Sequence, residues 1–341
     1  MSSLGPMRFA DILDQHHAIG LLRSALRSGR LHHAYVFAGP AGTGRAETAA
    51  AFAHALQCER YREDACGECD ACRRVSAGTH PDVRWIGPAP GRQSVGIDQI
   101  RDVRREAAYG PYEGRTKIFV VRPAETMLPE AQNSLLKLLE EPPPRVVFVL
   151  IAESAHALLP TVVSRCQLVR FNLVPIRQIE YALRVQYEVE PARARVLAAL
   201  SGGRVALAAE WARRPDALAD RDAVVELVAR VEREGLLAML EAAEKLAKEK
   251  DRLANLLDIA LLWYRDLIVW KEAADDTLLV NLDRKDDIAQ LSSQMDLAAL
   301  RRRVAAIEEA KSALRRNVNP RLALEAMFLR FDPTGEPAGR A

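Results

Sequence analysis

Four cysteines in one short segment are the clearest candidates for a chemical site. They follow the spacing C-x7-C-x2-C-x2-C, and the residues are Cys58, Cys66, Cys69 and Cys72. Four thiolates complete a tetrahedral Zn²⁺ shell without a water ligand, which is the structural type of zinc site. A redox C-x2-C pair and unrelated free thiols are alternatives, but neither accounts for four cysteines together. We therefore expect a structural zinc module at about 58–80, and we expect Cys166 to lie outside it.

A second candidate is a glycine-rich segment, GPAGTGRA over 39–46, which follows the apolar run Ala34–Ala38 and precedes an Ala-rich helix. Phosphate-binding loops follow the pattern G-x-x-x-x-G-K-[ST] in this context. Glycines at 39, 42 and 44 would let backbone N–H groups face an anion. Arg45, however, stands where the lysine belongs, and Ala46 replaces the hydroxyl that binds Mg²⁺. The candidate nucleotide-binding residues are therefore a degenerate set: Gly39, Gly42, Gly44, Arg45 and Ala46. A tight strand–turn–helix connection is the alternative explanation of the glycines.

The second half of an ATPase site is missing in the same way. An ATPase strand should end in an acidic residue that holds Mg²⁺, but the apolar run Lys117–Val121 is followed by Arg122 and Pro123. Glu125 comes three residues too late to be an obvious substitute. These departures together predict that the chain neither hydrolyses nor binds ATP. An active site in which Arg45 and Glu125 stand in for the missing groups is the alternative.

The elements that must position these residues alternate between strand and helix. Apolar runs at Ala34–Ala38, Lys117–Val121 and Val146–Ile151 indicate buried parallel strands. A helix is expected at Glu130–Glu141, before three prolines, and another begins at an Asp14 cap and closes at Gly29. Strands joined by helical crossovers predict a doubly wound parallel sheet. After Pro175 the strand signals stop and the pattern becomes helical, with Asn319-Pro320 as a strong helix start.

Composition limits the class of protein. The chain has 341 residues, of which 49% are hydrophobic, enough for two or three packed domains. Lys and Arg number 48 against 46 Asp and Glu, so the net charge of +2 does not describe a general polycation. Its longest dense apolar run, Val146–Ala152, is far shorter than the roughly 20 residues of a membrane helix. We therefore expect a cytoplasmic protein without membrane contact.

Several motifs together resemble those of bacterial DNA polymerase III clamp-loader subunits of the AAA+ class. The resemblance covers residues 8–175 and extends more weakly to 332. It is carried by the loop GPAGTGRA, the four cysteines and four further stretches: His32–Tyr35 (HHAY), Ala77–Asp82 (AGTHPD), Asn133–Pro143 (NSLLKLLEEPP) and Leu159–Gln167 (LPTVVSRCQ). The last two are highly specific in combination, whereas the loop alone would not be.

The resemblance implies an architecture and a set of roles. The expected domains are an α/β AAA+ domain at 1–175, a helical lid at 176–217, a helical collar for oligomerisation at 218–332 and a tail at 333–341. Arg165, within the triplet Ser164-Arg165-Cys166, would be an arginine finger that acts in trans on a neighbouring subunit's ATP. Arg204 resembles a second sensor arginine, although a packing or lid role explains it equally well.

The resemblance also implies partners and a place in a larger enzyme. Since active subunits of the family keep lysine, threonine and the acidic residues, this chain resembles the member of the ring that does not hydrolyse ATP. It would be part of a DNA-polymerising holoenzyme without catalysing a reaction itself. Its partners would be the ATPase paralogue (gamma/tau) and the clamp-opening delta subunit and, through the complex, the sliding clamp and primer–template DNA. The alternatives are an active clamp-loader ATPase and a free-standing zinc-containing DNA-binding protein.

Overall fold

The computed structural model describes residues 7–60, 63–214, 216–316 and 318–331. The chain forms two compact units, one made of 1–179 with 203–207 and the other of 180–202 with 208–341. The domain boundaries expected at 175 and 217 stay predictions. None of the helices in the described ranges is both long and apolar enough to cross a membrane.

The first unit is built on a five-stranded sheet in the order β2-β3-β4-β1-β5, with all neighbours parallel. The strands are β1 (Ala34–Ala38), β2 (Val83–Ile86), β3 (Lys117–Val121), β4 (Val146–Ala152) and β5 (Gln167–Arg170). In the centre of the sheet, Val36 of β1 lies between Leu150 of β4 and Leu168 of β5. The expected class, an α/β domain with a parallel sheet followed by helices, is confirmed.

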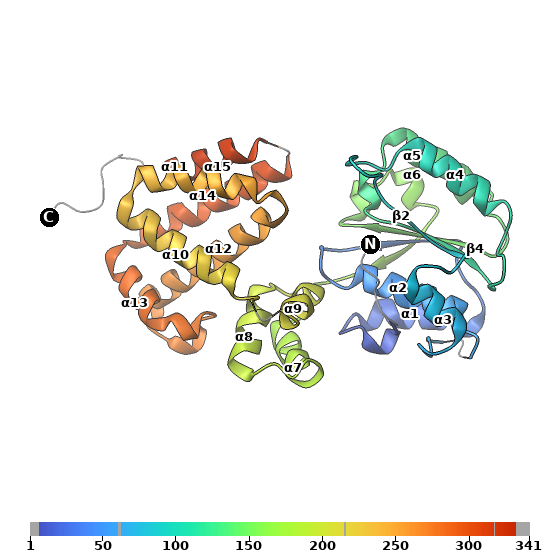
Figure 1. Ribbon diagram of the computed structural model, residues 1–341, viewed down its shortest axis with the longest axis horizontal. Coiled ribbons are helices and arrows are strands. Elements are labelled where there is room, and N and C mark those ends of the chain that lie inside the picture. Colours follow the sequence, from blue (N-terminus) through green and yellow to red (C-terminus); the bar gives the residue numbers. More distant parts are fainter. Residues whose placement is uncertain (1–6, 61–62, 215, 317, 332–341) are drawn as a thin grey trace. The chain divides into compact units, whose positions relative to one another are not determined.

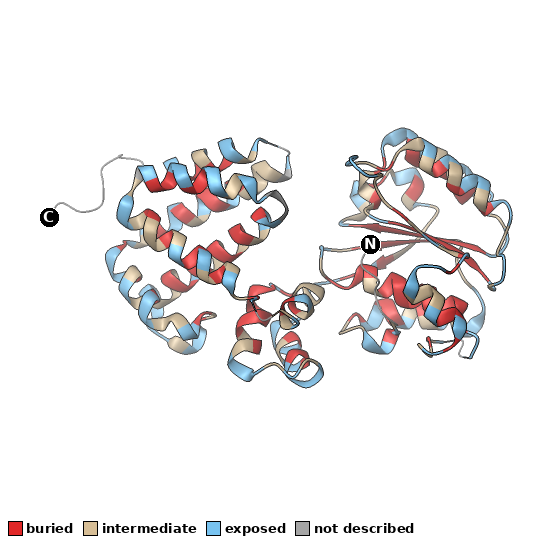
Figure 2. Cartoon of the chain, viewed as in Figure 1, coloured by how far each residue is buried: buried red, intermediate tan, exposed pale blue. Residues whose placement is uncertain are grey.

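Helices cover both faces of this sheet (Figure 1). One face packs on α1 (His16–Ser28) and α2 (Arg45–Gln57), with α3 (Asp70–Ala77) beside them. The other packs on α4 (Ile97–Ala107), α5 (Pro129–Glu140) and α6 (Pro160–Val163). Strand side chains alternate between the two cores, since Ile118 and Val120 face α2 whereas Phe119 and Val121 face α5. Both faces of the sheet are therefore covered by helices, and the central strands β1, β3 and β4 are buried along their whole length (Figure 2).

The start of α1 differs from expectation. Asp14 does not cap the helix, because Gln15 is the N-cap residue and both residues have positive φ, 59° and 44°. The Gln15 side chain instead donates a hydrogen bond of 2.7 Å to the carbonyl oxygen of Asn172. Gly29 ends the helix as predicted, with φ of 66°. A long-range contact has thus replaced local capping chemistry.

The described part of the second unit consists of helices and the segments that connect them. It contains α8 (Pro191–Leu200), α10 (Ala219–Glu234), α11 (Leu236–Lys248), α12 (Lys250–Ala273), α13 (Lys285–Gln294), α14 (Leu297–Arg315) and α15 (Pro320–Leu329). Helices α7 (Ile176–Gln186) and α9 (Val205–Ala212) each begin in the first unit and continue into the second. The predicted start of the last helix is confirmed, since the Asn319 side chain accepts hydrogen bonds from the N–H groups of Arg321 and Leu322.

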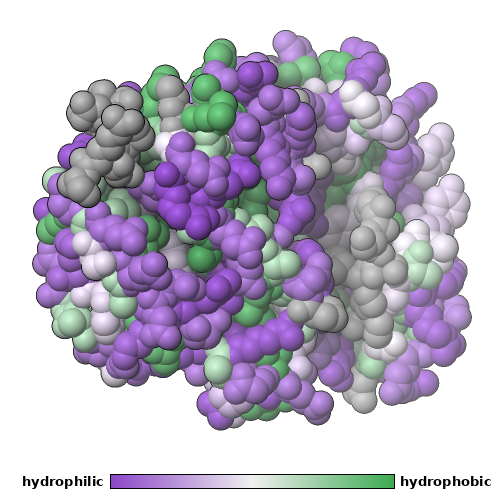
Figure 3. All heavy atoms as spheres, turned by 60° about the vertical axis from the view of Figure 1, so that its left-hand side comes forward, coloured by the Kyte–Doolittle hydropathy of each residue, from purple (hydrophilic) through white to green (hydrophobic). Residues whose placement is uncertain are grey.

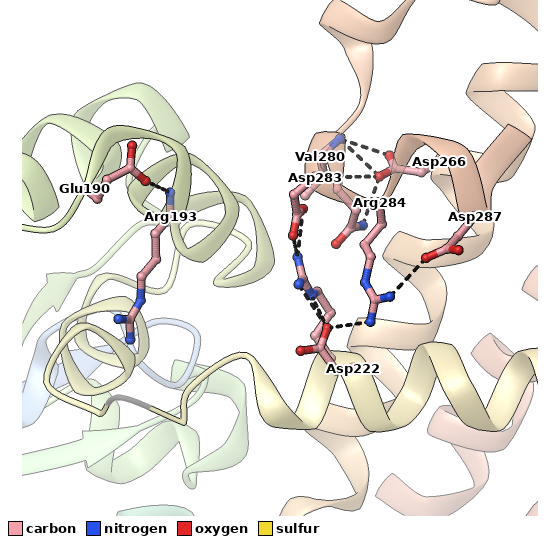
Figure 4. A network of polar contacts seen from close by, with 10 residues as sticks. Glu190, Arg193, Asp222, Asp266, Val280, Asp283, Arg284 and Asp287 are labelled. Carbon is pink, nitrogen blue, oxygen red and sulfur yellow. Dashed lines mark hydrogen bonds and ion pairs between the residues drawn. The ribbon is translucent and has the colours of Figure 1, made fainter.

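A network of ion pairs joins α10 to the start of α13 in the second unit (Figure 4). The guanidinium of Arg221 is 5% exposed and pairs with both Asp222 and Asp283. Arg284 lies between Asp222 and Asp287, at 3.1 and 3.0 Å. Because the buried Arg221 has two carboxylate partners, the network links α10 to the segment that precedes α13 without leaving this cation unpaired.

Candidate functional site

The four cysteines meet at one point in the first unit. Cys58 ends α2, Cys69 is the N-cap of α3, and Cys72 lies in the first turn of α3. The sulfur atoms of these three and of Cys66 lie within 4.8 Å of one another, and three of the four residues are buried. Four sulfurs at about 2.3 Å from Zn²⁺ would be about 3.8 Å apart, so the set fits a tetrahedral thiolate site.

Backbone N–H groups point at these sulfur atoms. The Cys66 sulfur accepts from the N–H groups of Glu68 and Cys69, at 3.4 and 3.3 Å, and the Cys58 sulfur accepts from that of Cys66, at 3.4 Å. Burial raises the pKa of the Cys66 thiol, but the N–H groups of Glu68 and Cys69, together with the neighbouring thiols of Cys69 and Cys58, outweigh it and bring the pKa down to about 7. Burial and the neighbouring thiols raise the pKa of Cys72. A bound metal cation would favour the thiolate form of all four cysteines, because the thiolate is the form that binds metal, and would so offset the burial that raises these pKa values.

The cysteine segment has almost no apolar core of its own. Its buried cluster consists of the cysteines with two alanines, Ala65 and Ala71. Asp64 ties the segment to the rest of the unit by accepting hydrogen bonds from the backbone of Phe9 and from the Arg23 side chain, at 2.8 and 2.7 Å. Cys166 lies elsewhere, against the core beneath α5, where burial raises its pKa to about 12.

The glycine-rich loop connects β1 to α2, as the sequence predicts. A Cβ on Gly39 would lie 2.2 Å from the Phe171 carbonyl oxygen, and a Cβ on Gly42 would lie 3.0 Å from the Cβ of Arg204. Gly44, with φ of 92°, is the N-cap of α2. The three glycines are therefore required by close packing and by the turn, independently of any bound anion. The expected alternative, a tight strand–turn–helix connection, accounts for all of them.

Arg45 and Ala46 form the first turn of α2 and are both largely buried. Burial lowers the pKa of the Arg45 guanidinium, and the charges of Glu125 and Glu153 partly oppose this effect. One guanidinium nitrogen of Arg45 and one carboxylate oxygen of Glu125 are buried without a hydrogen-bond partner. The carboxyl ends of β3 and β4 thus place acidic residues beside an arginine, where an ATPase has lysine and Mg²⁺.

The remaining residues that depart from an ATPase pattern, or that were expected near the loop, lie after β3 and beside Gly42. Arg122 directly follows β3 and is exposed, whereas Glu125 lies in the short 3₁₀ helix Ala124–Thr126. Glu125 is therefore closer to the loop in space than its sequence position suggested, since its charge acts on Arg45. Arg204, partly exposed, lies against Gly42, and the neighbouring Ala206 N–H donates to the Gly42 carbonyl at 2.9 Å.

The Ser164-Arg165-Cys166 triplet forms the turn between α6 and β5. One guanidinium nitrogen of Arg165 donates to the Thr161 carbonyl at 3.0 Å, and another lies 2.9 Å from a carboxylate oxygen of Glu140 on α5. The Arg165 side chain remains 37% exposed. The ring of His33, from the HHAY stretch, lies beside the backbone of Leu139 and Arg165. Three motifs that are distant in sequence therefore meet at Arg165, two of them at its side chain or turn and the third, through His33, at its backbone.

Asp82, the end of the AGTHPD stretch, has a role that sequence inspection did not assign. It is fully buried, and its carboxylate accepts hydrogen bonds from three consecutive N–H groups, those of Tyr112, Glu113 and Gly114, at 2.6, 3.0 and 2.7 Å. Burial raises the pKa of this carboxyl, but the three donors outweigh burial and hold it below its ordinary value. Glu113 also pairs with Arg74 of α3, so this loop joins the cysteine segment to the sheet.

A parallel sheet with a glycine-rich loop between β1 and α2 defines the first unit as an α/β domain of the nucleotide-fold type, and helices follow it. Comparisons with known proteins give its family. The sequence profile described as "DNA polymerase III, delta subunit" matches residues 14–175, and its C-terminal counterpart matches 215–332. The delta' subunit of Bacillus subtilis DNA polymerase III is 31% identical over 318 residues, which is 92% of this chain and 95% of that protein. The chain belongs to the delta-prime family of DNA polymerase III subunits.

Two further relatives frame this assignment. The delta' subunit of Pseudomonas aeruginosa is 42% identical over 135 residues, 39% of this chain and 41% of that protein. The tau subunit of Bacillus subtilis is 26% identical over 352 residues, and the match takes in 96% of this chain but only 62% of the tau protein. The chain is therefore similar to both kinds of subunit, and the delta' relative matches it over nearly the whole length of both proteins.

Proposed function

We propose that the chain is a non-hydrolysing clamp-loader subunit that supplies Arg165 to the ATP site of a neighbouring subunit. The observation that carries this proposal is the contrast between two arginines. Arg45 is buried in the chain's own glycine-rich loop, whereas Arg165 stands partly exposed on a well-anchored turn. A cation held near a γ-phosphate stabilises the charge that develops during transfer, and such fingers contribute about 10³–10⁵ in rate.

The chain's own loop supports the first half of the proposal. Ala46 offers no oxygen to Mg²⁺, and the planar guanidinium of Arg45 is larger than the lysine ammonium that normally contacts phosphates. The active-ATPase alternative needs Glu125 to bind Mg²⁺, but its charge already faces Arg45. We expect no ATP turnover by the purified chain. Turnover that disappears in Arg45→Ala but survives in Arg170→Ala would establish the alternative.

The role in trans is tested by reconstituting the complex with the gamma/tau ATPase, the delta subunit and this chain carrying Arg165→Ala. The complex should assemble normally, because truncating a partly exposed arginine costs little stability. Its clamp- and DNA-stimulated turnover should lose the contribution of one ATP site. Arg165→Lys should rescue poorly, since an ammonium lacks the planar fork that matches phosphate oxygens.

Arg170→Ala is the matched control for that experiment. Arg170 is exposed at the end of β5, five residues from Arg165, so the change removes the same charge from the same region. An intact complex with unchanged turnover in Arg165→Ala would show that Arg165 is an ordinary interface arginine. Equal losses in both variants would show a general charge effect.

The cysteine module is proposed to bind one structural Zn²⁺ through Cys58, Cys66, Cys69 and Cys72. Bound zinc would supply cross-links to a segment that has only two buried alanines besides its cysteines. Cys69→Ser should abolish the metal content measured by elemental analysis and loosen residues 63–78, while the second unit stays folded. Cys166→Ser is the control and should retain the metal; its loss there would contradict the ligand assignment.

The C-terminal helices of the second unit, at 218–332, are proposed to be the collar through which the chain joins its partners, and 176–217 the lid. Helices α11 and α15 pack together, and both leave leucines exposed, among them Leu237 (71%), Leu322 (61%) and Leu329 (55%). Small apolar groups interrupt the hydrophilic surface in the space-filling view (Figure 3). Contact with the gamma/tau and delta subunits would cover such groups, and contact with the sliding clamp and primer–template DNA would follow through the complex.

A further inference from the structure

Glu140 is the residue that holds the exposed tip of Arg165. Its carboxylate lies 2.9 Å from one guanidinium nitrogen, while the Thr161 carbonyl accepts from another at 3.0 Å. The Glu140 side chain is 50% exposed and that of Arg165 is 37% exposed. The guanidinium is thus tethered from two sides and still open to solvent.

The electrostatics of α5 do not explain an acidic residue at this position. Glu140 is the last residue of α5, and Glu141 follows it as the C-cap. The carboxyl end of a helix carries a partial negative charge, which favours cations and disfavours carboxylates. Lys137 in the last turn suits that end of the helix, but Glu140 does not. The contact with Arg165 supplies the positive charge that the position requires.

The backbone on both sides of Arg165 is held by hydrogen bonds. The Ser164 hydroxyl donates to the Thr161 carbonyl at 3.1 Å, and the Cys166 N–H donates to the Val163 carbonyl at 3.1 Å. Cys166 packs against the core beneath α5, so the turn is anchored to the same helix that carries Glu140. The position of the Arg165 backbone is therefore set independently of its side-chain tip.

We propose that Glu140 is a positioning residue for Arg165, an inference that rests on the trans-acting role proposed above. A long arginine side chain loses rotamer freedom when it is fixed, and the Glu140 contact imposes this loss before the neighbouring nucleotide arrives. A guanidinium has five N–H donors, so the contacts with Glu140 and Thr161 leave donors for the phosphate oxygens. Glu140 thereby directs the donors that remain.

The experiment uses the reconstituted complex with Glu140→Ala, Glu140→Gln and a matched control. Glu141→Ala removes the same charge one residue away, at an exposed position that makes no ion pair within the described part of the chain. We expect Glu140→Ala to lower kcat at the ATP site that Arg165 serves by about two- to fivefold, the range that a half-exposed ion pair supports. The KM for ATP should stay unchanged, because the neighbour binds the nucleotide. Glu140→Gln should recover part of the loss through its amide oxygen, and Glu141→Ala should have no effect.

A double variant separates positioning from indirect effects. Glu140→Ala should cost nothing further in an Arg165→Ala background, since there is no guanidinium left to orient. Three results would overturn the inference. A higher kcat in Glu140→Ala would mean that the pair restrains the finger instead of positioning it. An unchanged kcat, or a loss of kcat that persists in the Arg165→Ala background, would mean that Glu140 does not act through Arg165. If Arg165→Ala itself leaves turnover unchanged, the proposed function fails. If Arg165→Ala lowers turnover and Glu140→Ala does not, only the positioning role fails.

Discussion

Replacing Asp82 with asparagine should destabilise the first unit by releasing the loop that links the cysteine segment to the sheet. The native carboxylate accepts three N–H groups in a row, from Tyr112, Glu113 and Gly114. Asparagine has one acceptor oxygen and an NH₂ group that cannot accept, so at least one of these N–H groups loses its partner. The loop is also closely packed, because a Cβ on Gly114 would lie 2.0 Å from an oxygen of Gln57.

The expected loss is about 2–4 kcal/mol in the free energy of unfolding. Hydrogen bonds to ionised groups are each worth about 1.5–3 kcal/mol, and the amide oxygen of the variant can keep at most two of the three, in weakened form. Since a domain has a total stability of about 5–15 kcal/mol, the variant should fold but open more readily. The pKa of Asp82 is lower in the native protein than in the unfolded chain, where an Asp has a pKa of about 4. The carboxylate therefore stabilises the fold fully at pH values above this unfolded pKa. This contribution disappears as the pH falls through the lower native pKa, so the two proteins should converge in acid.

Hydrogen exchange measured by mass spectrometry across a urea series would test this, with peptides that span residues 109–121. At neutral pH the variant should lose protection at the three amides and unfold at lower urea. Asp98→Asn is the control, because that side chain is 85% exposed and the charge change is identical. A variant within about 0.5 kcal/mol of the native protein, the usual range of surface substitutions, would refute the assignment of these bonds to Asp82.

Two other substitutions give sharp expectations. Gly39→Ala should lower the stability of the first unit, measured by urea denaturation, by at least about 2 kcal/mol, because the new methyl would overlap the Phe171 backbone. Gly96→Ala is the control and should be tolerated in the same assay, because its Cβ would meet only a Gln99 oxygen at 4.0 Å. Arg303→Ala should cost the second unit about 3–5 kcal/mol, because Glu232, which is 11% exposed, would lose its bidentate partner at 2.6 and 2.7 Å. Arg302→Ala, on the exposed side of the same helix, should leave urea unfolding unchanged, and equal losses in the two variants would contradict this explanation.

The central strands were predictable because burial on both faces leaves a continuous apolar run. The bounds of β1 and β3 equal the predicted runs, and β4 extends one residue further, to Ala152. The edge strands β2 and β5 were not predicted, because each has a single buried residue and a mixed sequence, VRWI and QLVR. Their pairing depends on their neighbours in the sheet, which a local pattern does not reveal.

The candidate sites likewise divide into local features, which the sequence reveals, and long-range contacts, which it does not. The four cysteines lie close together in the sequence, so their spacing alone predicted that their thiols would meet. The pairs Arg165–Glu140 and Arg45–Glu125 join residues that are 25 and 80 positions apart, through strand order and helix packing. One signal for Glu140 was present in the sequence, namely two glutamates at the end of a helix where cations are preferred.

The glycine-rich loop shows why a glycine pattern alone is weak support for nucleotide binding. Gly39 is required by the Phe171 backbone, Gly42 by the Arg204 side chain and Gly44 by the helix start. These requirements hold whether or not a phosphate is bound, so the glycines can persist in a loop that no longer handles ATP. Arg45 and Ala46 meet no such backbone requirement, because both occupy ordinary helical positions in the first turn of α2. The discriminating positions are therefore those whose side chains would touch phosphate or metal. In this chain the buried guanidinium of Arg45 lies in the loop, whereas that of Arg165, on a different turn, is 37% exposed.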